Sequence, residues 1–377
     1  MTPLSRRTAL RIGGASLAAA VAGCLGRSDE SDPADGSTSP DDTTDASNGD
    51  GSLDVEIKQY DGVDGTPRWY DETSAQLVVI DSEERARAAL GAPVGSDATG
   101  EFVSATDFAE SVLLFVAAAA PNACYGRIDV SDVRADGGRL VGSAAAVDES
   151  DGETACAEVV SFPAALVRVT FDGDPVTGAS LSVTDGWGET ADLDATADDS
   201  LGPDPEDLAG HVRPDGDPER VPPALDCDDD EFRRHIQPFD EEDLQWGEAT
   251  GDDGDPRFAM RVDRTAVDRG GEVRVTLTNV ADEVLTVGNS DKHSLQVYTD
   301  AGWQDVRGAT GDHPFAYTDE AYELPPGEGF EWNLSMTKDS VVADHQIDLT
   351  VCPGLPAGRY RFVFWNPTVA VAFDLRE

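Results

Sequence analysis

The amino-acid sequence predicts a mainly β protein: a C-terminal β-sandwich and an N-terminal β-rich domain of α+β character, preceded by a disordered tether. Apolar and polar residues alternate along the last third of the chain, which is the period of a half-buried strand. The region 53–196 has short apolar runs separated by turns rich in glycine, proline and aspartate. Two low-complexity segments, 24–52 and 197–245, precede these regions and set the domain boundaries.

The C-terminal region, residues 246–377, is predicted to be a sandwich because its strands have one apolar face. In Val273–Thr278 the apolar side chains occupy every second position, and Arg359–Phe364 repeats this pattern with aromatic residues. Stretches such as Pro325–Gly329 supply the turns. About seven such strands within about 130 residues are typical of two antiparallel sheets packed around one core.

The region 53–196 is predicted to be a β-rich domain with one short helix. Val112–Val116 is a continuous apolar run of strand length, which indicates a strand buried on both faces. A Gly-Gly pair at 137–138 separates two further strands and predicts a hairpin. The segment Ser82–Leu90 begins with a serine that suits an N-cap and continues with two glutamates, so we expect a helix there.

Residues 197–245 are predicted to be an acidic, proline-rich connector. Proline recurs along the segment, for example as Pro222-Pro223, and this density favours an extended, semi-rigid spacer. Glu231–Gln237 is expected to add a helical turn. The acidic run Cys227–Glu231 lacks the glycine and the terminal glutamate of a calcium-binding loop, so we interpret it as solvated surface.

The charge of the chain excludes several classes of partner. Its 377 residues include 75 Asp and Glu against 27 Lys and Arg, a formal net charge of −48. No stretch supplies the basic footprint that nucleic acid or an anionic lipid surface requires. Such a charge repels itself at low salt but is screened in molar salt, where the Debye length is about 3 Å. The composition resembles that of proteins from salt-loving archaea.

The N-terminus is predicted to direct export and membrane attachment. Arg6 and Arg7 precede an apolar stretch that is too short to span a membrane and that ends in small residues before Cys24. This layout resembles the twin-arginine signal and lipobox of haloarchaeal exported lipoproteins. The resemblance implies that residues 1–23 are removed and that a lipid on Cys24 holds the protein at the extracytoplasmic face of the cell membrane. Residues 24–52, almost wholly small and polar, are expected to form a disordered tether.

Four cysteines remain after Cys24, and an even number favours disulfides in an exported protein. Three pairings are open. We favour Cys124 with Cys156, which share one predicted domain, and Cys227 with Cys352, which ties the connector to the last domain. A metal site on these residues is not favoured, because Cys-x-x-Cys spacing is absent and no histidine follows Cys352, as a copper loop requires.

No catalytic residue, cofactor or metal ligand is predicted. The sequence has no Gly-x-Ser-x-Gly elbow, no phosphate-binding glycine-rich loop and no His-Glu-x-x-His motif. The five histidines are interpreted as separate surface residues: His211, His235, His293, His313 and His345. The alternative is a metal site that loops gather at one end of the sandwich, from His293, His313 and His345 with Asp291 or Asp312.

Three residues that the sequence pattern places near the surface are further candidates for contact with a ligand, a partner or a glycan. Trp187 and Trp303 lie next to turns, where an aromatic ring can stack on a sugar or a partner, although packing at a sheet edge is the favoured interpretation. Asn333 begins an Asn-Leu-Ser sequon, and the alternation of its strand places it on the outward face. It is therefore a candidate glycosylation site.

The segment from Arg257 to Asp374 resembles bacterial immunoglobulin-like domains, on the residues Val273–Asn279 and Leu355–Tyr360. The resemblance implies a sandwich in which the Tyr360 hydroxyl ties a sheet corner, and it implies little about function. We expect a non-enzymatic binding or structural module on the outer face of the membrane, with a protein or cell-envelope partner. The alternative is an exported hydrolase or metal-dependent enzyme with an unrecognised site.

Overall fold

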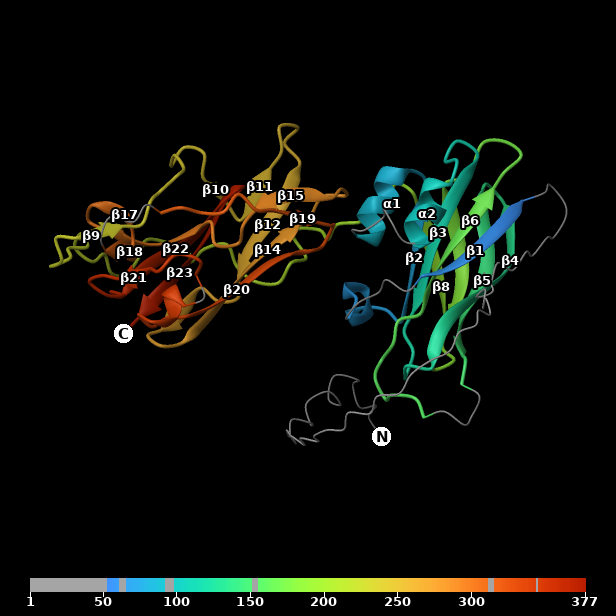
Figure 1. Cartoon of the computed structure of the whole chain (residues 1–377), viewed down its shortest axis with the longest axis horizontal. Helices are drawn as coiled ribbons and strands as arrows, with labels where there is room; N and C mark the ends of the chain where they lie inside the picture. Colours follow the sequence, from blue (N-terminus) through green and yellow to red (C-terminus); the bar gives the residue numbers. More distant parts are fainter. Residues whose placement is uncertain (1–52, 61–65, 92–97, 151–154, 311–314, 344) are drawn as a thin grey trace, which may run out of the picture. The chain divides into compact units, whose positions relative to one another are not determined.

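The computed structural model describes residues 53–60, 66–91, 98–150, 155–310, 315–343 and 345–377. The protein is mainly β, as predicted, and contains two β domains, each with a core of its own (Figure 1). Arg6, Arg7, Cys24 and the tether lie outside the described residues, so their assignments stay predictions.

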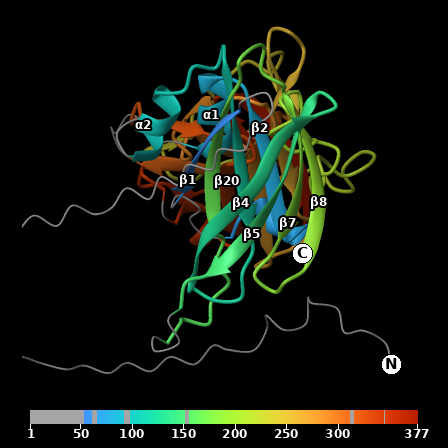
Figure 2. The same cartoon turned by 90° about the vertical axis from the view of Figure 1, so that its right-hand side faces the viewer.

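The N-terminal domain has two four-stranded sheets. Sheet I is antiparallel and contains, in spatial order, β1 (Asp54–Tyr60), β6 (Ala164–Thr170), β3 (Ser111–Ala118) and β2 (Ala75–Ile80). Sheet II contains β4 (Tyr125–Asp136), β5 (Arg139–Asp148), β7 (Gly178–Thr184) and β8 (Thr190–Thr196), with β5 and β7 parallel (Figure 2). A short 3₁₀ helix, η2 (Arg68–Asp71), precedes β2.

Strand β3 lies at the centre of this domain, and its two faces belong to two different cores. Val112, Leu114 and Val116 pack against sheet II. Leu113 and Phe115 face the other way, toward the two helices. Because both faces are covered, every residue of β3 is buried, which explains the continuous apolar run in the sequence.

The prediction of a single helix in this domain is wrong. Helix α1 (Glu83–Leu90) forms where expected, and the backbone N–H of Arg85 donates to the Ser82 hydroxyl, the N-cap contact. A second helix, α2 (Ala98–Ser104), contains threonine and glycine, which are weak helix formers. It is stabilised by packing instead, because Phe102 and Val103 are buried against sheet I.

The C-terminal domain is a β-sandwich of two larger sheets with two small sheets beside them. Sheet III contains β10 (Gln245–Trp246), β23 (Thr368–Arg376), β22 (Gly358–Trp365), β16 (His293–Thr299) and β17 (Gly302–Asp305), and β13 (Ala266–Asp268) also pairs with β23. Sheet IV contains β11 (Glu248–Thr250), β12 (Pro256–Val262), β14 (Glu272–Asn279) and β20 (Gly329–Ser335). The small sheets are β15 (Leu285–Gly288) with β19 (Ala321–Leu324), and β21 (Thr350–Val351) with β18 (Arg307–Thr310) and β9 (Phe232–Arg234); a 3₁₀ helix, η3 (Ser340–Val342), follows β20.

The alternation read from the sequence correctly places the core of this sandwich. Val273, Val275 and Leu277 of β14 are buried against the aromatic side chains of β22. Tyr360 is fully buried, and its hydroxyl donates to the carbonyl of Pro356 at 2.8 Å. This is the corner hydrogen bond that the immunoglobulin-like resemblance implied.

The connector is not the separate, semi-rigid spacer that its proline density suggested, because it pairs with the sandwich. His211 and Val262 exchange two backbone hydrogen bonds of 2.8 Å, β9 pairs with β18, and β10 pairs with β23. Glu231–Gln237 accordingly contains a strand rather than a helical turn. Proline keeps the chain extended without donating to a ladder, so the remaining backbone groups pair with the sandwich. From His211 onward, the connector is therefore part of the C-terminal domain.

Candidate functional site

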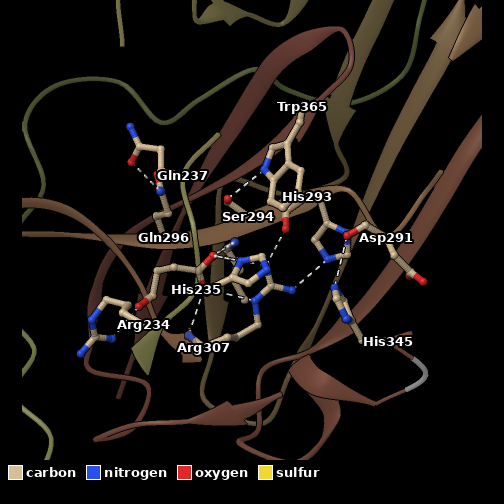
Figure 3. Close-up of polar contacts among 12 residues, drawn as sticks. Arg234, His235, Gln237, Asp291, His293, Ser294, Gln296, Arg307, His345 and Trp365 are labelled. Atoms are coloured by element: carbon tan, nitrogen blue, oxygen red, sulfur yellow. Dashed lines mark hydrogen bonds and ion pairs between the residues drawn. The ribbon is translucent and has the colours of Figure 1, made fainter. Parts of the chain in front are cut away.

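Three of the five histidines lie together in the C-terminal domain, contrary to their interpretation as separate surface residues (Figure 3). The histidine cluster comprises His235, His293, His345, Asp305, Arg307 and Tyr317. His235 follows β9, His293 begins β16, and Asp305 and Arg307 flank the step from β17 to β18. Strand pairing brings together residues that are up to about a hundred positions apart in the sequence. His211 lies elsewhere, and His313 and Asp312 lie outside the described residues.

The Asp305–Arg307 ion pair forms the centre of the cluster. Both side chains are about 1% exposed. One oxygen of Asp305, Oδ1, accepts from the backbone N–H of Arg307 at 2.9 Å and from its Nε at 3.2 Å. Burial alone raises the pKa of the Asp305 carboxyl, but Arg307 and His235 outweigh that effect and hold this pKa far below its ordinary value. Asp305 is therefore ionised and balances the buried guanidinium.

His235 joins the connector to this ion pair. Its Nδ1 lies 3.2 Å from Asp305 Oδ2, and its Nε2 contacts the Tyr317 hydroxyl. The imidazole stacks on Trp365, with the two ring centroids 5.4 Å apart. Asp305, His235 and Tyr317 thus form a carboxylate–imidazole–hydroxyl chain. Burial raises the pKa of the Tyr317 hydroxyl, which makes it a poor nucleophile.

His293 and His345 are each held in one neutral tautomer. The Nδ1 of His293 lies 3.0 Å from the carbonyl of Ser290 and must donate to it, so Nε2 accepts from Arg307 Nη1 at 3.0 Å. The backbone N–H of Ile347 donates to Nδ1 of His345, so its Nε2 carries the proton and donates to the carbonyl of Asp291 at 3.2 Å.

Burial is the main reason that these two rings stay uncharged. It lowers the pKa of His293 well below the ordinary value and that of His345 to about 4, and the charge of Arg307 acts in the same direction. All ring nitrogens of His235, His293 and His345 therefore have a partner within the protein.

The arrangement of these histidines also tests the alternative that loops bring them together as a metal site. His293, His345 and Asp291 do lie together, as that alternative required. However, the Arg307 guanidinium occupies Nε2 of His293, and a buried cation opposes a second one. Within the described ranges, no group of three or more His, Cys, Asp or Glu side chains is arranged to hold a metal ion.

Both disulfides form in the favoured pairing. Cys124 is bonded to Cys156, and Cys227 is bonded to Cys352, with Cα–Cα distances of 5.5 and 5.8 Å. The second bond fixes the connector next to the cluster. Arg234 reinforces this attachment because its Nη1 donates to the carbonyls of Asp305 and Cys352, at 2.6 and 3.2 Å.

The remaining candidate residues lie apart from the cluster. Trp187 is 48% exposed at the turn after β7. Trp303 is packed between Tyr298 and the Arg361 guanidinium, which agrees with the interpretation of edge packing. Asn333 is exposed on β20, on the outward face as predicted, and its amide donates to Glu331 at 2.8 Å. Glycosylation of Asn333 stays a prediction.

Sequence reasoning missed Asp305, Arg307 and the role of His235. One signal was present: Asp305 and Arg307 are two positions apart, so a continuous strand places both charges on one face. Nothing in the sequence indicated that this face is covered by the connector.

No protein-family model matches the chain, and the searches found no similar curated protein or solved structure. In the described part of the chain, no helix is long and apolar enough to cross a membrane.

Proposed function

We propose that this protein is a lipid-anchored, extracytoplasmic module with a non-enzymatic binding or structural role. One observation carries the proposal: the side chains that most resemble a catalytic centre are fully committed to one another. Every ring nitrogen of the histidine cluster has a partner within the protein, and its ion pair is buried. A network that is satisfied in this way fixes the position of the connector.

Two further features support an extracytoplasmic location. Each β domain has a disulfide, and such bonds persist in oxidising compartments outside the cytoplasm. The acidic composition suits an environment of high salt. The partner in this proposal is a protein or a cell-envelope component, and the membrane is contacted through the lipid on Cys24.

The anchor is tested by replacing Cys24 with serine in the full chain and fractionating salt-grown cells. We expect the wild type in the membrane fraction and the C24S variant in the soluble, exported fraction. Ser28→Ala, four residues along the tether, is the matched control and should stay with the membrane. A C24S variant that remains membrane-bound would contradict lipid anchoring.

The non-enzymatic role is tested by elemental analysis of the protein purified from salt-grown cells without chelators. We expect Zn, Cu, Fe and Mn all well below one atom per chain. A stoichiometric metal that is lost in His345→Asn would instead support the metal-dependent enzyme.

A further inference from the structure

The segment between His235 and β10 crosses the outer face of sheet III and is attached there by side chains. We call residues 236–244 the strap. The ends of the strap are fixed, by buried His235 on one side and by the β10–β23 pairing on the other. Among the described residues, no backbone hydrogen bond joins the strap to the sheet, and its bond from Asp243 to Asp240 is internal. Such a segment can leave the sheet without breaking a ladder.

Arg361 of β22 lies beneath the strap in an unusual position for an arginine. The alternation of β22 points it away from the core, yet it is only 1% exposed. Its guanidinium lies over the Trp303 ring, 4.5 Å from the centroid, and its Nε donates to Gln296 Oε1 at 2.6 Å. Stacking and this hydrogen bond fix the plane of the guanidinium before any carboxylate arrives.

The two remaining guanidinium nitrogens of this arginine are occupied by one carboxylate of the strap. Nη1 donates to Glu241 Oε2 at 2.7 Å, and Nη2 donates to Oε1, which is the bidentate geometry that arginine forms with carboxylates. The hydrogen bonds from Arg361 lower the pKa of Glu241. In contrast to the arginine, the Glu241 side chain is 50% exposed. The arginine is therefore buried, and the Glu241 carboxylate that it binds lies at the surface.

Three side chains of the strap contact the sheet, and the last of them, Glu241, lies in a turn that is closed by the hydrogen bond from Asp243 to Asp240. Gln296 Nε2 donates to Gln237 Oε1 at 3.0 Å, and Phe239 lies 5.9 Å from the Arg361 guanidinium carbon. Figure 3 shows the Gln237–Gln296 contact beside the histidine cluster. Binding of an acidic side chain by an arginine is a recurring mode of peptide recognition.

We propose that Arg361, Trp303 and Gln296 form a binding site for an acidic peptide segment of a partner protein, and that Glu241 occupies this site as an internal substitute. The partner is a peptide that presents a glutamate in a turn, because the strap shows how the surface accepts this side chain. Displacement of the strap opens the site, while the disulfide Cys227–Cys352 and His235 keep the rest of the connector in place. The inference rests on the proposed binding function, but it is independent of membrane anchoring.

The test uses the purified full chain at molar salt and a capped synthetic peptide that copies residues 237–243. We expect Glu241→Ala to bind this peptide at least about tenfold more tightly than the wild type, because a strap that occupies the site about 90% of the time weakens binding by that factor. Calorimetry measures both dissociation constants. Glu242→Ala is the matched control: it removes a neighbouring exposed carboxylate and should behave like the wild type.

Two further arms identify the chemistry. A peptide with glutamine at the position of Glu241 should bind the Glu241→Ala variant at least about tenfold more weakly, because it cannot form the charged bidentate pair. Arg361→Lys in the same background should lose the peptide as well, since lysine has no planar fork. If that double variant fails to fold, the glutamine peptide still shows whether binding requires the carboxylate.

The proposal is overturned if folded Glu241→Ala, checked by near-ultraviolet circular dichroism, does not bind the peptide, or if the glutamine peptide binds equally well. Acetate that binds as tightly as the peptide would overturn the assignment to a peptide. Should Glu241→Ala itself not fold, Glu241→Gln takes its place with the same expected outcomes. Membrane release of C24S does not affect any of these results.

Discussion

The two β domains bury different kinds of side chain. The N-terminal domain packs apolar strands between a sheet and two helices, and Asp185 is the charged residue that it buries among those described. The C-terminal domain buries Arg261, Asp305, Arg307 and Arg361 as well as two histidines. Apolar packing stabilises a fold without choosing neighbours closely, whereas a buried charge requires specific partners. In the C-terminal domain, buried polar groups hold the connector against the sandwich.

Salt sharpens this contrast. At molar salt, exposed ion pairs such as Arg139–Asp194 are screened over about 3 Å. The buried pair Asp305–Arg307 is screened much less. At molar salt, the buried charges are therefore the ones that still determine structure.

The largest expected effect comes from the disulfides. Cys227→Ser with Cys352→Ser opens a loop with a sequence separation of 125, and Cys124→Ser with Cys156→Ser opens one of 32. Chain entropy predicts losses in the free energy of unfolding of about 4.9 and about 3.7 kcal/mol, respectively. Denaturant titration of each variant at molar salt measures both. A larger loss of stability after removal of Cys124–Cys156 than after removal of Cys227–Cys352 would contradict this expected order.

Removal of one charge from the buried pair should cost nearly as much. Asp305→Ala leaves the Arg307 guanidinium buried without its counter-charge, so we expect the C-terminal domain to lose about 3–5 kcal/mol of stability. The control is Asp194→Ala, whose pair with Arg139 is exposed and should contribute less than about 1 kcal/mol. Equal effects of the two changes would show that burial does not distinguish these ion pairs.

The sequence predicted the sandwich well because alternation is a direct consequence of strand geometry. Val273, Val275 and Leu277 are buried, and Arg361 points outward, as the pattern requires. The pattern cannot show that an outward face is covered. Arg361 is buried because the strap crosses it, and the strap is over a hundred positions away in the sequence.

The histidine cluster escaped prediction for a related reason. Its members meet through pairings such as β9 with β18 and β16 with β22, which no local pattern encodes. Proline density correctly indicated an extended connector but not where it docks. Helix α2 was missed because its stability comes from Phe102 and Val103 on sheet I rather than from its own residues. The cysteine pairing could be predicted from the sequence, because Cys124 and Cys156 share one predicted domain and Cys227 and Cys352 remain.

Acid should destabilise the C-terminal domain before the N-terminal domain. The folded pKa of His345 is about 4, below the ordinary 6.5, so the unfolded chain takes up its proton first as the pH falls. Stability is therefore lost progressively between about pH 6.5 and pH 4. The depressed pKa of Asp305 adds a loss at lower pH, in the same direction.

Histidine supplies an internal control for this acid effect, because all five histidines lie at position 211 or later. Thermal unfolding followed between pH 7 and 4 should show the C-terminal transition moving down while the N-terminal transition changes less. His345→Asn keeps an acceptor near the position of Nδ1 and should reduce the pH dependence. A larger decrease in the N-terminal transition temperature than in the C-terminal one would contradict this expectation.

The smallest effect is expected at the sheet corner. Tyr360→Phe removes the hydrogen bond to the Pro356 carbonyl and keeps the ring in the core, so we expect a loss of about 1 kcal/mol. Tyr298→Phe, at a tyrosine that is 37% exposed, is the control and should be nearly neutral. The stabilities of the two variants are compared by their denaturant midpoints, provided that the m-value is unchanged.

The commitment of the histidine cluster to structure is tested most directly by ¹⁵N NMR of the imidazole rings in histidine-labelled protein at neutral pH. We predict neutral rings with the proton on Nδ1 of His293 and on Nε2 of His345, and chemical shifts that do not change when Zn²⁺ or Cu²⁺ is added. Opposite tautomers, or metal-dependent shifts at two or more of His235, His293 and His345, would contradict a structural role and favour a metal-dependent enzyme.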